Sequence, residues 1–109
     1  MNVYIEDIAG HAGQTVTLRG WLHNRRSSGK IHFLTLRDGT GFIQCVMSKA
    51  AVGEEAFGRA DHLSQESAIA ITGAVRADAR APGGFELDVS QLDVVAESQN
   101  YPITPKEHG

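Results

Sequence analysis

The fold is decided by residues 15–47, which read TVTLRGWLHNRRSSGKIHFLTLRDGTGFIQCVM. Three stretches of this segment have the composition of strands, and turn residues separate them. The predicted strands are Thr15–Asn24, Ile31–Arg37 and Phe42–Met47, and the predicted turns are Ser27–Lys30 and Asp38–Gly41. Apolar side chains recur at every second position in the first two strands, which is the period of a strand with one core face. The third strand is almost continuously apolar, which indicates burial.

The remaining elements complete a recognisable order. A short helical turn is predicted around Ile5–Ala9, and the spacing of apolar residues predicts one helix between Val52 and Leu63. Alternation then resumes from Ile69 to Val75 and from Phe85 to Val89, on either side of a turn at Ala81–Gly84. Three strands, a helix and two strands are typical of an all-β fold, the five-stranded Greek-key OB-fold barrel, which commonly binds oligonucleotides.

Length and composition predict one domain. The chain has 109 residues, of which 41% are hydrophobic, enough for a single packed core. We expect this domain over residues 1–95, followed over residues 96–109 by a polar, proline-containing linker toward a catalytic domain outside the sequence. No apolar run approaches the roughly 20 residues that cross a membrane, so a cytoplasmic protein is expected. The single cysteine, Cys45, lies in an apolar strand, where a buried reduced thiol is the ordinary outcome.

Charge is spread unevenly along the chain, whose net charge is −3. Residues 1–49 carry six Lys and Arg against three Asp and Glu, whereas residues 50–109 carry four against ten. Five basic residues lie close together in sequence: Arg19, Arg25, Arg26, Lys30 and Arg37. A basic face on an acidic protein favours selective nucleic-acid binding, although an ordinary solvated surface has the same composition.

Phe33 is the aromatic residue best placed to contact a ligand. The alternation puts it opposite the core leucines of its strand, on the same side as Trp21 and His23 of the preceding strand. An exposed ring among arginines can stack a nucleobase, which contributes roughly 1–3 kcal/mol per base. A small hydrophobic cluster of Ile31 and Phe33 under a loop fits the same pattern, so both interpretations stay open.

Two polar residues could read the edge of a base. Gln44 interrupts the apolar third strand with one donor group and one acceptor, which suffices for the edge of a pyrimidine. A buried glutamine bonded to the backbone would show the same pattern. Glu66, just before the fourth strand, could accept from a base amino or imino group, or simply end a turn.

No catalytic or metal-binding pattern accompanies these residues. The sequence has no glycine-rich phosphate loop, and its acidic residues are scattered. Its five histidines have no cysteine partners at metal-ligand spacing. His23 and His32 lie on adjacent predicted strands and could come close by chance, but two ligands alone do not make a metal site. We therefore expect no catalytic residue and no metal site.

In their order and register, these residues resemble the N-terminal anticodon-binding domain of asparaginyl- and aspartyl-tRNA synthetases, which are class II enzymes. The motifs that carry the resemblance are Gly20-Trp21-Leu22-His23-Asn24-Arg25-Arg26, Ile31-His32-Phe33-Leu34, Leu36-Arg37-Asp38-Gly39-Thr40-Gly41 and Ile43-Gln44. The similarity continues to Tyr101-Pro102-Ile103 and Lys106-Glu107-His108-Gly109. The segments Arg26–Lys30 and Asp38–Gly41 favour the asparaginyl group, since aspartyl relatives tend toward Asp-Leu-Gly and Arg-Glu-Gly there.

The resemblance implies a role for each candidate. Phe33 matches the aromatic residue that stacks on the central uridine of the anticodon, and Gln44 matches the residue that hydrogen-bonds this base. Arg26 and Glu66 match other anticodon-contacting positions. Arg25 and Lys30 are expected to hold phosphates together with Arg26. The whole predicted anticodon-binding set is Phe33, Gln44, Arg26, Glu66, Arg25, Lys30 and His23.

The resemblance also implies a parent enzyme, a homodimeric ligase that uses ATP and Mg²⁺ to attach asparagine to its tRNA. Because the catalytic motifs are absent from this sequence, the chain is expected to bind a tRNA anticodon loop, to need no cofactor and to be inactive alone. Three alternatives stay open: the corresponding aspartyl domain, a free-standing OB-fold binder of single-stranded nucleic acid, and a protein-interaction domain, which would need an exposed apolar patch.

Overall fold

The computed structural model describes residues 1–97 of the chain, which fold around one closed sheet. In chain order the elements are η1 (Ile5–His11), β1 (Thr15–Ser28), β2 (Ile31–Arg37), β3 (Phe42–Ser48), α1 (Lys49–Val52), α2 (Glu54–Asp61), β4 (Ala68–Ala77), η2 (Pro82–Gly84) and β5 (Phe85–Ala96). Apart from Ala96, which ends β5, and Glu97, the predicted linker lies outside the described residues.

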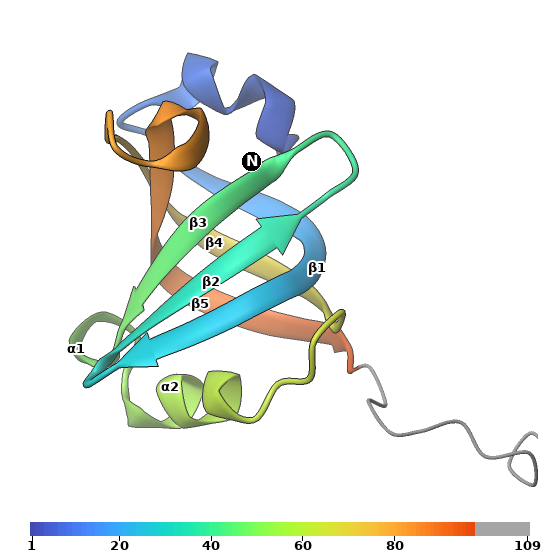
Figure 1. Ribbon diagram of the computed structural model, residues 1–109, viewed down its shortest axis with the longest axis vertical. Helices are drawn as coiled ribbons and strands as arrows, with labels where there is room; N and C mark the ends of the chain where they lie inside the picture. The colour runs from blue at the N-terminus through green and yellow to red at the C-terminus, as the bar shows by residue number, and fades with distance from the viewer. Residues whose placement is uncertain (98–109) are drawn as a thin grey trace, which may run out of the picture.

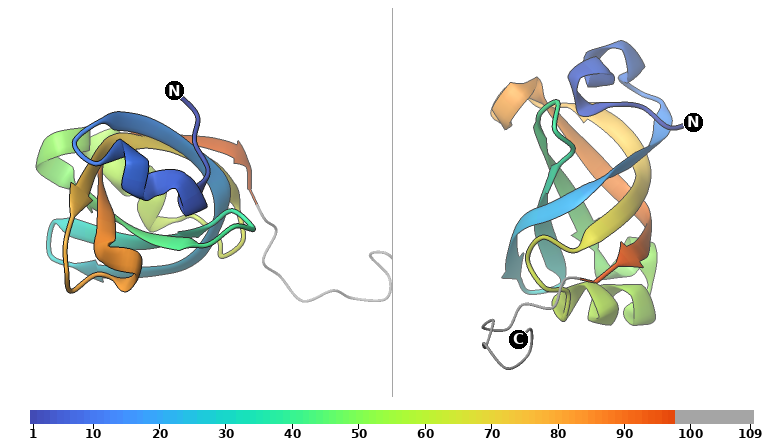
Figure 2. Two further views of the ribbon diagram at one scale, coloured as in Figure 1. Left: turned by 90° about the horizontal axis from the view of Figure 1, so that it is seen from above. Right: turned by 90° about the vertical axis from the view of Figure 1, so that its right-hand side faces the viewer.

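The five strands close into a barrel in the order β1-β2-β3-β5-β4. All neighbouring strands are antiparallel except β3 and β5, which pair in parallel. Viewed from above, the strands form a ring with η1 at one end (Figure 2), and α1 and α2 lie at the opposite end (Figure 1). The predicted five-stranded OB-fold barrel is confirmed.

The barrel interior is filled by the apolar side chains that alternate along the strands. Burial of each such side chain stabilises the fold by about 1.5–3 kcal/mol. The largest fully buried aliphatic side chains are Leu18, Leu22, Leu34, Leu36, Met47, Ile69, Ile71 and Leu87. Because side chains alternate, the residues between them in β1, β2 and β3 point outward and form the sheet face described below.

β1 changes partners along its length. Its first half pairs with β4 and its second half with β2. At Gly20, β1 lies so close to β2 that a Cβ atom would collide with the carbonyl oxygen of Arg37. A bulge between Leu22 and Asn24 then shifts the register. β1 continues past its predicted end to Ser28, because its last residues pair with β2, and the predicted turn is reduced to its last two residues.

The helical segment differs from the single predicted helix. It is divided into α1 and α2 by Gly53, whose φ of 92° is a conformation that favours glycine. Ser48 caps α1, since its hydroxyl accepts a hydrogen bond from the backbone N–H of Ala51 at 3.2 Å. No helix within residues 1–97 is long and apolar enough to span a lipid bilayer.

Two strands depart from their predicted burial. β3 is not continuously buried: Phe42 is exposed and Gln44 and Val46 are half-buried, because only one face of a barrel strand points inward. Glu86 departs in the opposite sense. Glu86 alternates with the apolar residues Phe85 and Leu87, a pattern that predicts a solvent-facing side chain, yet it is only 8% exposed. At this point β5 pairs with β3 through Gln44 and with β4 through Arg76.

Candidate nucleic-acid interface

The outer face of β1, β2 and β3, called the sheet face from here on, consists of three rows of paired residues. The cross-strand pairs are Arg26, Phe33 and Val46 in the first row, Asn24, Thr35 and Gln44 in the second, and Trp21, Arg37 and Phe42 in the third. The ends of this face are called the Phe33 end and the Phe42 end. Sequence alternation predicts that Phe33 shares its side with Trp21 and His23, and it leaves open whether Gln44 is buried. The register places Phe33, Trp21 and Gln44 on this face, whereas His23 falls in the bulge of β1.

At the Phe33 end, an arginine lies over the aromatic ring. The Arg26 guanidinium carbon is 4.4 Å from the ring centroid of Phe33, which is half-buried. The ring is thus in contact with a cation. A nucleobase can stack on an aromatic ring or on a guanidinium plane, so this pair offers both kinds of surface.

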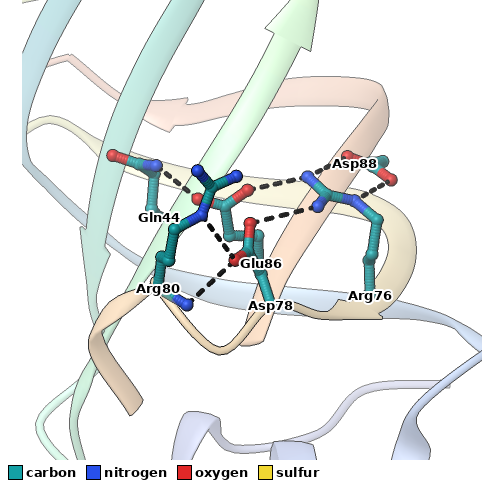
Figure 3. Close-up of polar contacts among 6 residues, drawn as sticks. All are labelled: Gln44, Arg76, Asp78, Arg80, Glu86 and Asp88. Atoms are coloured by element: carbon teal, nitrogen blue, oxygen red, sulfur yellow. Dashed lines mark hydrogen bonds and ion pairs between the residues drawn. The ribbon is translucent and has the colours of Figure 1, made fainter. Parts of the chain in front are cut away.

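Gln44 is held by a side chain, in contrast to the backbone bonding that the sequence left open. Its Nε2 donates to Glu86 Oε2 at 2.5 Å. In Figure 3 the amide oxygen of Gln44 points away from Glu86. Because the amino group is engaged, Oε1 is the atom presented to a ligand, and it can accept a hydrogen bond but not donate one.

Glu86 belongs to a network that the sequence did not predict. Its Oε1 accepts from the Arg76 guanidinium at 2.7 Å, and Arg76 also donates to both carboxylate oxygens of Asp88, at 2.9 and 3.1 Å (Figure 3). Hydrogen bonds to Asp88 and Glu86 raise the pKa of Arg76. The buried Glu86 carboxylate is thus held between two donors, the guanidinium of Arg76 on one oxygen and the amide of Gln44 on the other.

Arg25 is not brought to the sheet face. It pairs across the strands with the buried Leu34, and its guanidinium donates to the carbonyl oxygens of Ala60 at 3.1 Å and Leu63 at 2.5 Å. Ala60 lies in the last turn of α2 and Leu63 follows the helix, so Arg25 fastens the end of α2 to β1. It also lines a cavity of about 360 Å³ beside the loop that follows α2.

At the Phe42 end, the structure brings His23 and Glu66 together. His23 Nδ1 lies 3.9 Å from Glu66 Oε2, and the guanidinium of Arg37 forms an ion pair with Glu66 Oε1. Glu66 has a φ of 69°, unusual for a residue other than glycine, and its backbone N–H donates to the carbonyl oxygen of Leu22 at 2.6 Å. Such conformations concentrate at functional sites.

The remaining predicted residue, Lys30, is exposed in the turn between β1 and β2. It lies at the Phe33 end, since the turn follows the pair Ser28 and Ile31. Six of the seven candidate residues therefore lie along one face, with Arg26, Phe33 and Lys30 at one end, Gln44 in the middle row, and His23 and Glu66 at the other end. Arg25 is the exception.

The described residues include no cluster of metal ligands, and their one cysteine is buried. Within residues 1–97, no three His, Cys, Asp or Glu side chains are grouped to hold a metal ion. Cys45 is fully buried, as predicted, and burial together with the charge of Glu86 raises the pKa of its thiol. His32 is also buried, and its ring bonds to Ser27 and to the carbonyl oxygen of Phe57.

Comparison with known proteins places the fold among nucleic-acid binders. Residues 16–95 match the family described as the OB-fold nucleic acid binding domain. The chain is similar to the asparagine–tRNA ligase of Thermus thermophilus, with 59% identity over 110 residues, which cover 100% of this chain and 25% of that protein. The chain thus spans about a quarter of the length of such relatives.

Two solved structures are similar as well. Asparaginyl-tRNA synthetase from Pyrococcus horikoshii, complexed with asparaginyl-adenylate, superposes with a TM-score of 0.86 and 39% identity over 100% of this chain and 26% of that chain. Aspartyl-tRNA synthetase from Entamoeba histolytica superposes with a TM-score of 0.85 and 28% identity, over 94% of this chain and 22% of that chain. The resemblance inferred from the sequence is confirmed.

Proposed function

We propose, since the chain belongs to the family of OB-fold nucleic acid binding domains, that it recognises the anticodon loop of tRNA as a domain of an asparagine–tRNA ligase. The observation that carries the proposal is the arrangement of the sheet face. It combines the Phe33 ring beneath Arg26 with the outward amide oxygen of Gln44, one strand away. Unstacked bases of RNA loops are the ligands that such faces bind.

The central base of the anticodon is the proposed ligand of Phe33 and Gln44. A base stacked at Phe33 would direct its edge toward Gln44, whose Oε1 accepts hydrogen bonds only, as long as Glu86 holds the amino group. Uracil offers an N–H at ring position 3. Cytosine has a bare acceptor nitrogen there, so two acceptors would face each other without a hydrogen bond. The pair therefore favours uridine.

Phosphate contacts are assigned to the basic side chains at the Phe33 end. Lys30 and Arg26 are exposed there and can approach the backbone of the loop. Arg25 was expected to join them, but its hydrogen bonds to the end of α2 give it a role in positioning the helix. His23 and Glu66 are proposed to contact the loop at the other end of the face.

The wider activity is inferred from the relatives. The whole protein would attach asparagine to its tRNA with ATP and Mg²⁺, as a homodimer in the cytoplasm, with this domain contributing recognition and no catalytic residue. A free-standing binder of single-stranded nucleic acid is the alternative, and it would tolerate any central base.

The test compares RNA stem-loops that differ only in the central anticodon base. At fixed salt, the uridine loop should bind the chain roughly 5- to 150-fold more tightly than the cytidine or adenosine loop, the equivalent of about 1–3 kcal/mol for an unmade hydrogen bond. Gln44→Ala should reduce this preference, whereas Gln91→Ala, an exposed glutamine on β5, should not. Equal affinity for all three loops would refute anticodon reading and favour the alternative.

A further inference from the structure

Phe42 is exposed although it begins a strand that supplies the barrel core. Its ring is 51% exposed, whereas the other three phenylalanines are half-buried. It lies on the sheet face, in the row beyond Gln44. Part of an apolar ring is thus left in water on the face proposed to bind RNA, and a ligand that covered it would gain hydrophobic burial.

The ring has aromatic and charged neighbours, together called the Phe42 cluster: Trp21, His23, Arg37, Phe42 and Glu66. The rings of His23 and Phe42 meet edge to face, with centroids 5.0 Å apart. The Arg37 guanidinium carbon lies 5.1 Å from the ring centroid of Trp21, which is 41% exposed. The cluster therefore repeats the combination of aromatic ring and arginine found at Phe33.

The spacing of the two ends limits what can bind both. Phe33 pairs with Val46, four positions along β3 from Phe42. At about 3.3 Å per residue, the two rings are attached about 13 Å apart. Neighbouring bases stacked in a helix are separated by only about 3.4 Å, so bases on both rings could not be stacked on each other. An RNA strand that reaches both must be extended, with its bases splayed apart.

We propose that Phe42 is a second base-stacking platform, which binds another base of the same RNA loop whose central anticodon base stacks at Phe33. This proposal rests on the proposed function and deepens it, since it adds a stacking residue that the sequence did not single out. Continuity favours RNA as the occupant: Gln44 and Thr35 lie between the two rings on the same uninterrupted sheet face.

The charges of the cluster distinguish this platform from the first. Arg37 is paired with Glu66, so its charge is matched within the protein. Stacking at Phe42 should therefore release few counterions, and its contribution to affinity should not depend on salt. The Phe33 end, where Arg26 and Lys30 are exposed, should behave in the opposite way.

The experiment measures binding of the uridine stem-loop to variants of the 109-residue chain. Phe42→Ala should weaken binding about 5- to 150-fold, the range that corresponds to roughly 1–3 kcal/mol per stacked base. Phe42→Tyr keeps a stacking ring and should bind nearly as well, whereas Phe42→Leu keeps only apolar area and should resemble Phe42→Ala. Tyr4→Ala, which removes an aromatic side chain that is 62% exposed outside the sheet face, is the matched control.

A second readout follows the site directly. Trp21 is the only tryptophan of the chain and belongs to the cluster, so its fluorescence should change when the stem-loop binds. Wild-type affinity in folded Phe42→Ala, together with a loss in Phe33→Ala, would overturn the proposal and leave the proposed function standing. Phe42 would then be assigned to a protein contact. If the wild-type chain bound no RNA, the proposed function would fail first.

Discussion

The two ends of the sheet face place an arginine over an aromatic ring in the same way, yet they use its charge differently. Arg26 lies over Phe33, and within residues 1–97 it forms no ion pair. Arg37 lies over Trp21 and is paired with Glu66. The first end has a cation without an acidic partner among residues 1–97, which the proposed function assigns to phosphate, whereas the charge of Arg37 at the second end is matched by Glu66. One face could thus combine a phosphate contact whose affinity falls with salt and a base-stacking contact whose affinity does not.

The largest expected effect is a loss of stability when Asp38 is replaced, because this residue holds the turn beside the Phe42 end. Asp38 accepts hydrogen bonds from the backbone N–H of Ile5 at 2.8 Å and from the N–H and hydroxyl of Thr40 at 2.8 and 2.7 Å. Asp38→Asn turns one of these oxygens into a donor. It should lower the free energy of unfolding by about 1.5–3 kcal/mol at pH 7, as measured by urea denaturation.

The same carboxylate gives this effect a pH dependence. Burial raises the pKa of Asp38, but the hydrogen bonds from Ile5 and Thr40 outweigh it and hold the pKa below the ordinary value of 3.8. The carboxylate thus stabilises the fold fully above pH 3.8, and this contribution is lost as the pH falls through the lower folded value. The difference between wild type and Asp38→Asn should shrink below this pH, and a difference that persisted in acid would contradict the assignment.

A smaller effect is expected from the row between the two ends. Glu86→Gln preserves shape but allows the amide of residue 86 to donate, so that Gln44 can turn its amino group outward. The preference for a central uridine over cytidine should fall about fivefold, the equivalent of roughly 1 kcal/mol for one hydrogen bond. Stem-loop titrations measure it, and Glu97→Gln, at an exposed position after β5, serves as the control. An unchanged preference for uridine over cytidine would show that the hydrogen bond to Glu86 does not determine how Gln44 reads the base.

The smallest effect concerns the cation at the Phe33 end. Lys30→Gln should reduce the slope of log affinity against log salt by about 0.7, which amounts to roughly a threefold change between 50 and 200 mM salt. Lys49→Gln is the control, since Lys49 lies at α1 and pairs with Glu54 at 3.4 Å. Phe42→Ala should leave this slope unchanged. If Lys30→Gln and wild type had equal slopes, the inference that the Phe33 end binds RNA electrostatically through Lys30 would be contradicted.

The parts of this face that follow a regular strand could be predicted from sequence. β2 keeps its alternation from Ile31 to Arg37, so the outward direction of Phe33 can be predicted from sequence. The polar Gln44, which interrupts an apolar strand, marks the same face on β3. Arg25 was predicted beside Arg26, but the bulge after Leu22 shifts the phase of β1, and its side chain points to α2 instead. One bulge is enough to reverse a facing inferred from period two.

Other features depend on contacts between distant segments, which no local pattern contains. The role of Glu86 arises from the parallel pairing of β3 with β5 and from Arg76 on β4. The apolar neighbours of Phe42 in sequence predict burial, whereas its position on the outer face of β3 leaves it exposed. The division of the helix could have been predicted, because Gly53 lies between the residues of α1 and those of α2. Glycine at that position marks a possible break.

The hydrogen bond between Gln44 and Glu86 also has an evolutionary consequence. Under the proposed function, the base preference of this face depends on two residues that are far apart in the sequence, one in β3 and one in β5. A mutation at Gln44 alone would leave a buried carboxylate short of a donor, and a mutation at Glu86 alone would release the amide from its orientation. If the face reads a base as proposed, a lineage that changes this base would have to alter both positions or pass through an intermediate with weaker recognition.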